Sequence, residues 1–96
     1  MDITEILLWV EKNKASITIE SGPSYLYNNL GELDYEKMIK EEGNSGFFVE
    51  ISLNEDCAGF AYKRSLIEAI KSAFSEMINF GVELSVIDKQ TYNLFQ

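Results

Sequence analysis

The clearest hydrophobic pattern in the chain runs from Ser65 to Phe80 and has the spacing of an amphipathic helix. Its apolar residues recur every three or four positions on one broad face: Leu66, Ile67, Ile70, Ala73, Phe74, Met77 and Ile78. Ser65 and Glu68 form the S-x-x-E pattern of a capping box, and Gly81 suits a helix end. A face this broad must cover apolar surface, so we expect the helix to pack on a sheet.

A second helix is predicted over residues 2–13. Asp2 and Glu5 have the spacing of another capping box. The inward face consists of Ile3, Ile6, Leu7 and Val10, with Trp9 at its edge.

Alternating apolar and polar residues predict three strands, at 15–20, 47–53 and 57–63. The turn from Asn54 to Asp56 joins the last two strands into a hairpin. Gly59 in the third strand indicates a bulge or a close approach of another backbone. Alternation of Val82, Leu84 and Val86 predicts a fourth strand over 82–87.

A long connection, residues 25–46, separates the first two strands. It contains a predicted short helix over 35–42, with Asp34 as its N-cap and Gly43 after its end. Loops of this length are uncommon in compact domains and are often functional.

These elements predict one α+β domain spanning residues 1–96. We expect a two-layer sandwich in which an antiparallel sheet of three to four strands is packed by the N-terminal and C-terminal helices. The predicted order is α-β-(short α)-β-β-α-β.

Charge narrows the range of partners. The chain has 16 acidic and 8 basic residues, for a net charge of −8. Such a chain repels phosphate backbones and anionic membranes and is attracted to basic protein surfaces, although acidity also serves solubility. We therefore expect no direct contact with nucleic acid or membrane. The missing basic leader pattern and the lack of a long apolar run predict a cytoplasmic protein.

The sequence contains no recognisable catalytic or cofactor motif. It has no histidine, and its one cysteine, Cys57, lies in an apolar strand typical of a core residue. The carboxylate pairs Glu41-Glu42 and Glu55-Asp56 lack the spacing of a calcium loop. Lys63 and Arg64 precede the last helix, as phosphate-gripping residues do in double-stranded RNA-binding domains, but Glu68 follows them. We expect a protein that is not an enzyme and needs no cofactor or metal.

Two groups of residues are the predicted binding surface for a protein partner. Acidic and aromatic side chains of this kind suit contact with a basic protein. The first group lies in the long connection and comprises Glu32, Asp34, Glu36, Glu41, Glu42, Tyr25, Tyr27 and Tyr35. The second group is the hairpin turn, Asn54, Glu55 and Asp56. Phe48, on the polar face of its strand, is either part of such a surface or covered by the long connection.

The chain resembles small phage-encoded inhibitors, the type II-A anti-CRISPR proteins that block Cas9. The opening MDITEILLWVEKNKASITIESG is similar to the first helix and strand of one such inhibitor. IKSAFSEM, from Ile70 to Met77, is similar to its later helix, and the Asn54–Asp56 turn stands where the family has an Asn/Asp-rich turn. The resemblance implies a DNA-mimicking acidic surface in which Asn54, Glu55 and Asp56 contact the nuclease.

Two other functions fit the same sequence. An immunity protein that neutralises a basic bacterial toxin would have the same size and charge. A structural or oligomerisation domain would use residues 82–86 as an edge strand, with acidity serving solubility alone. The sequence leaves open whether the protein is a monomer or a dimer.

Overall fold

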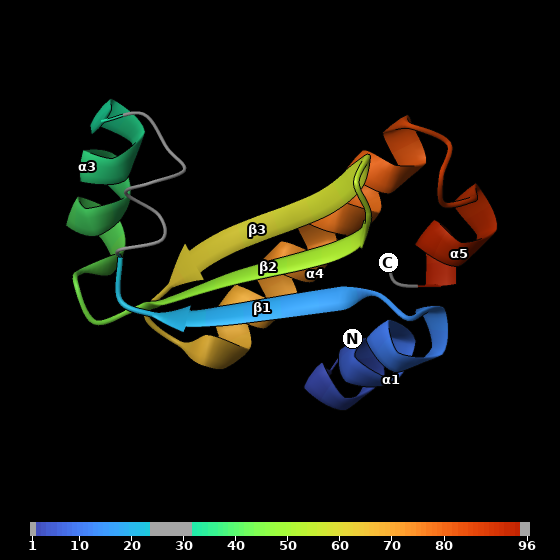
Figure 1. Ribbon diagram of the computed structural model, residues 1–96, viewed down its shortest axis with the longest axis horizontal. Helices are drawn as coiled ribbons and strands as arrows, with labels where there is room; N and C mark the ends of the chain where they lie inside the picture. Colours follow the sequence, from blue (N-terminus) through green and yellow to red (C-terminus); the bar gives the residue numbers. More distant parts are fainter. Residues whose placement is uncertain (1, 24–31, 95–96) are drawn as a thin grey trace.

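Three antiparallel strands form a sheet in the order β1-β2-β3 in the computed structural model, which describes residues 2–23 and 32–94 (Figure 1). The elements are α1 (Ile3–Asn13), β1 (Ser16–Ser21), α3 (Glu32–Glu42), β2 (Phe47–Asn54), β3 (Cys57–Lys63), α4 (Leu66–Glu83) and α5 (Lys89–Leu94). The predicted α+β architecture, with a three-stranded sheet packed against the C-terminal helix, is confirmed.

The pairing register places the apolar side chains of each strand on one face. Ile17 of β1 lies opposite Ile51 of β2, and Val49 of β2 lies opposite Ala61 of β3. Val49 and Ile51 are fully buried, because α4 crosses this face of the sheet (Figure 1). This layer is the main core of the protein.

Both predicted helices that flank the sheet begin at the expected caps. The Asp2 carboxylate accepts a hydrogen bond from the Glu5 amide at 2.9 Å, and the reciprocal bond completes the capping box of α1. The Ser65 hydroxyl accepts from the Glu68 amide at 3.4 Å and starts α4. Trp9 of α1 meets Phe74 of α4 edge to face, with ring centroids 5.2 Å apart, so α1 joins the same core.

The opposite face of the sheet carries a second, smaller core at one end. Phe48 and Tyr62 are buried there beneath three side chains of α3, Tyr35, Met38 and Ile39. The Tyr62 hydroxyl donates to the Gly43 carbonyl at 2.7 Å and accepts from the Gly46 amide at 3.0 Å. The long connection therefore covers Phe48, which confirms one of the two interpretations of that residue.

The predicted fourth strand is wrong. Instead, α4 continues to Glu83, and the chain then turns at Ser85, which has a φ of 60°. Ile87, after this turn, is buried in the core. Gly81 is not the helix end but a buried position within α4, where a β-carbon would lie 2.6 Å from the Ile87 side chain. The missing side chain makes room for Ile87, and this packing outweighs the alternation that suggested a strand.

Smaller differences concern the ends of the elements. α3 begins at Glu32, so Asp34 lies inside its first turn and is not the N-cap. The residues after Ile87 form α5, whose Tyr92 packs against the main core. Cys57 is buried as predicted, and its thiol donates to the Met77 carbonyl at 3.6 Å.

Candidate functional site

The two predicted acidic groups lie at opposite ends of the sheet. The hairpin turn stands at one end of β2 and β3, and α3 packs at the other end (Figure 1). A strand of eight residues, such as β2, spans about 23 Å at roughly 3.3 Å per residue. The groups are therefore two separate surfaces, and one small contact cannot use both.

The hairpin turn presents two free carboxylates. The Asn54 side chain accepts from the Asp56 amide at 2.9 Å, and the Ser52 hydroxyl donates to the Asn54 carbonyl at 2.9 Å. Asn54 therefore shapes the turn. The Glu55 and Asp56 side chains are exposed, and neither carboxylate has an ion pair or hydrogen bond with another described residue.

Apolar side chains lie directly beside these carboxylates. Phe80, Leu84 and Val86 are 41%, 45% and 41% exposed. Together with Glu55 and Asp56 they line a shallow groove of about 520 Å³. We call these five residues the tip surface.

The sequence reasoning missed the apolar half of the tip surface. It assigned Leu84 and Val86 to a strand and gave Phe80 no role. The available signal was the four-residue spacing of Phe80 and Leu84, which places both on one side of a helix that continues past Gly81. Only the extension of α4 brings them beside the hairpin turn.

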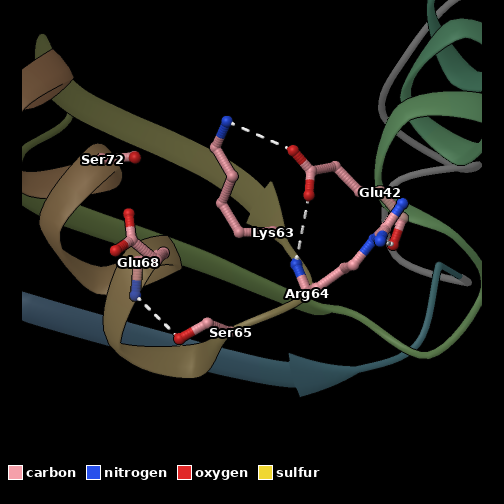
Figure 2. A pocket seen from close by; sticks show the side chains of 6 residues that line it. All are labelled: Glu42, Lys63, Arg64, Ser65, Glu68 and Ser72. Atoms are coloured by element: carbon pink, nitrogen blue, oxygen red, sulfur yellow. Dashed lines mark hydrogen bonds and ion pairs between the residues drawn. The ribbon is translucent and has the colours of Figure 1, made fainter.

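The second acidic group is partly used to hold α3 in place. Figure 2 shows the Glu42 carboxylate between Lys63, at 3.4 Å, and the Arg64 amide, at 3.3 Å. The Arg64 guanidinium donates to the carbonyls of Glu41 and Glu42 at 2.9 and 3.0 Å. These contacts fasten the end of α3 to the end of β3, so Glu42 has a structural role.

The remaining residues of this acidic and aromatic group differ in how exposed they are. Asp34, Glu36 and Glu41 have exposed side chains on α3, whereas Tyr35 is partly buried against Phe48 and Tyr62. Glu32 is the first residue of α3. Tyr25 and Tyr27 lie outside the described residues.

The basic residues before α4 are already engaged. A groove of about 310 Å³ at this point is lined by Lys63, Arg64, Ser65, Glu42, Glu68 and Ser72 (Figure 2). Lys63 pairs with Glu42, and Arg64 binds the end of α3, so the pair is not arranged to grip a phosphate. Burial raises the pKa of the Cys57 thiol above its usual value of 9.0, which makes it a poor nucleophile.

The described part of the chain holds neither a metal cluster nor a membrane-spanning helix. Residues 2–23 and 32–94 contain no group of three or more side chains that could hold a metal ion. No helix within these ranges has the length and apolarity that crossing a membrane requires. No protein-family model, curated protein or solved structure matches this chain.

Proposed function

We propose that this chain is a small acidic inhibitor that binds a basic, nucleic-acid-handling protein through its tip surface. The observation that carries the proposal is the pairing of two unengaged carboxylates, Glu55 and Asp56, with three exposed apolar side chains. Apolar area of this kind supplies affinity, and neighbouring charge supplies orientation and rapid association.

The charge of the whole chain favours the same class of partner. A net charge of −8 attracts basic surfaces over a distance comparable to the Debye length, about 8 Å at physiological salt. Proteins that bind nucleic acid carry such basic surfaces. An acidic protein seated there competes directly with the phosphate backbone.

Within this class, the resemblance to type II-A anti-CRISPR proteins makes Cas9 the first partner to test. The residues that the resemblance implies as contacts include Glu55 and Asp56, which also belong to the tip surface. Asn54 would act indirectly by shaping the turn.

The first experiment measures the charge dependence of partner binding. The purified chain serves as bait in a bacterial lysate, and the captured protein is identified and its Kd measured at about 50 and 500 mM salt. We expect the double variant Glu55→Lys/Asp56→Lys to weaken binding at least tenfold at low salt, or about 1.4 kcal/mol. The matched control, Glu11→Lys/Glu20→Lys, changes the net charge by the same amount at two exposed positions elsewhere and should weaken binding far less than the tip variant. Equal binding by the tip variant and wild type would contradict the proposal.

A second experiment tests the anti-CRISPR role directly. Guide-loaded Cas9 is assayed for DNA cleavage with the wild-type chain and with each double variant. Inhibition by wild type and by the control, but not by the tip variant, supports a Cas9 inhibitor. A captured toxin together with uninhibited Cas9 would instead favour an immunity protein.

A further inference from the structure

β3 is an edge strand whose outer side is not paired within the described part of the chain. Among residues 2–23 and 32–94, the sheet order β1-β2-β3 gives β3 one strand neighbour, β2. The sequence predicted a fourth strand that would have completed the sheet, but residues 82–87 are helix and turn. Figure 1 shows β3 along the rim of the molecule, between α3 and the end of α4.

The direction of the β3 backbone groups follows from one hydrogen bond. The Gly22 amide donates to the Gly46 carbonyl at 2.8 Å, which continues the β1–β2 register beyond the strand ends. Hydrogen-bonded pairs alternate along an antiparallel ladder, so every second residue of β2 from Gly46 onward bonds to β1. Their partners in β3, Ala58, Phe60 and Tyr62, therefore direct their N–H and C=O groups away from β2.

Two of these three residues are accessible. Ala58 and Phe60 are partly exposed, whereas Tyr62 is buried under α3. Each accessible residue offers one N–H and one C=O group to an incoming strand. An added strand needs only a short extended segment to use them.

Three hollows follow one another along the outer side of β3. The first is the groove near Arg64, the second is a groove of about 210 Å³ beside Phe60, and the third belongs to the tip surface. The residues that line them on the helix side recur every four positions in a row that winds around α4 as far as its C-cap, and we call this row the flank of α4: Glu68, Ser72, Glu76, Phe80 and Leu84. This flank forms one wall of a path that runs beside the whole edge of β3.

The path is strongly acidic. Six acidic residues line the three hollows, Glu41, Glu42, Glu55, Asp56, Glu68 and Glu76, against two basic residues, Lys63 and Arg64. Both basic residues are bound to the end of α3. Charge complementarity therefore selects a basic segment as the occupant.

We infer that the β3 edge accepts an extended, basic segment of the protein partner as a fourth strand, beside the flank of α4. The inference rests on the proposed function and adds the mode of recognition. In such a strand, alternate side chains face opposite ways. Those on the α4 side meet carboxylates such as Glu76, and those on the other side lie near Phe60 and the α3 residues Met38 and Glu41. Two copies of this chain would bring two acidic paths together, so a second copy fits the edge poorly.

The test uses a short synthetic peptide of alternating lysine and valine, with a peptide of alternating glutamate and valine as its charge control. Amide hydrogen exchange of the wild-type chain is measured by NMR with and without each peptide. We expect the basic peptide alone to slow exchange at Ala58 and Phe60 at least tenfold. No binding of the basic peptide at about 1 mM, or binding that leaves these two amides unprotected, would overturn the inference.

Two variants separate strand addition from simple charge attraction. Ala58→Pro removes an outward N–H that β2 does not use, and it should weaken peptide binding at least tenfold. Its matched control is Ile19→Pro on the outer side of β1, at a residue 45% exposed, which should bind like wild type. Glu76→Lys, on the surface of α4, should also weaken binding without touching the sheet.

The outcomes distinguish this inference from the proposed function. One possible result is that Ala58→Pro and Glu76→Lys bind the peptide and the captured partner normally, whereas Glu55→Lys/Asp56→Lys does not. This result would support the tip surface as the binding site and contradict strand addition at β3. If the wild-type chain forms a dimer that Ala58→Pro abolishes, the edge serves a second copy and the inference is wrong.

Discussion

Gly59 of β3 and Met77 of α4 lie so close that a β-carbon on Gly59 would stand 2.3 Å from the Met77 backbone nitrogen. The same β-carbon would be 2.5 Å from the Ala73 carbonyl oxygen. Both neighbours are backbone atoms of one helix, so no change of side-chain rotamer can relieve the contact. This contact sets the distance between the helix layer and the sheet, and therefore the position of every α4 residue beside β3.

Replacement of Gly59 by alanine should destabilise the fold strongly. The added methyl group forces α4 away from the sheet, and we expect a loss of about 3 kcal/mol or more, at the upper end of overpacking effects. Urea unfolding followed by Trp9 fluorescence measures it. Ala58→Ser changes the neighbouring residue on the other face and should stay within about 0.5 kcal/mol. A tolerated Gly59→Ala would mean that the layers separate easily.

Two phenylalanines on α4 should respond differently to the same truncation. Phe74 is 3% exposed and contacts Trp9, so Phe74→Ala should cost about 3–5 kcal/mol of unfolding free energy. Phe80 is 41% exposed, so Phe80→Ala should cost only about 1–2 kcal/mol. In partner binding we expect Phe80→Ala to be the defective variant, because it removes part of the tip surface. A stable Phe80→Ala variant with normal binding would remove Phe80 from that surface.

The hydroxyl of Tyr62 should contribute measurably to stability. It bonds to two backbone groups in the turn between α3 and β2, Gly43 and Gly46. Tyr62→Phe leaves the buried Gly46 amide without its acceptor, which should cost about 1–3 kcal/mol. Chemical denaturation compares it with Tyr92→Phe, whose hydroxyl has no bond to another described residue. Equal stability of the two variants would show that water replaces the lost contact.

Glu42 should matter more for α3 than for the whole protein. Its ion pair with Lys63 is partly exposed, and such pairs contribute at most about 1 kcal/mol. We expect Glu42→Gln to lower the unfolding free energy by less than that, yet to speed amide exchange in α3 several-fold. Glu36→Gln on the exposed side of α3 is the control. Identical exchange in the two variants would show that other contacts suffice to hold the helix.

Burial of the Cys57 thiol predicts a loss of stability in alkaline solution. The pKa of Cys57 is raised above 9.0 in the folded chain because burial disfavours the thiolate. In the unfolded chain the thiol ionises at its usual pKa, so its contribution is intact below pH 9.0 and is lost as pH rises toward the folded pKa. Between the two pKa values the slope is at most about 1.4 kcal/mol per pH unit.

The difference between wild type and Cys57→Ala isolates this effect from other titrating groups. Thermal unfolding from pH 8 to 10.5 should show that the wild-type Tm falls more steeply than that of the variant. Parallel curves would mean that the thiol ionises as easily in the folded chain as in the unfolded one.

Local patterns in the sequence were sufficient for most of the fold. The helix starts at Asp2 and Ser65, the hairpin over 47–63 and most of the inward face of α4 depend on residues close in sequence. Ile67, which was expected on that face, is 50% exposed. The prediction was wrong at residues 82–87. The alternation of apolar and polar residues there is compatible with a strand and equally with a helix end followed by a turn. The outcome there depends on Ile87 filling the space over Gly81, and no local pattern reports that contact.

The same distinction between local pattern and tertiary contact applies to the candidate site. The acidity of the chain and the carboxylates at the hairpin turn follow from sequence alone, because charge and turn residues need no partner to be recognised. The tertiary structure decided which of them are available. Glu42 pairs with Lys63, Phe80 lies beside Asp56, and no strand within residues 2–23 and 32–94 pairs with the outer edge of β3. Each of these is a relationship between residues far apart in the chain, and it depends on how α3 and α4 pack on the two faces of the sheet.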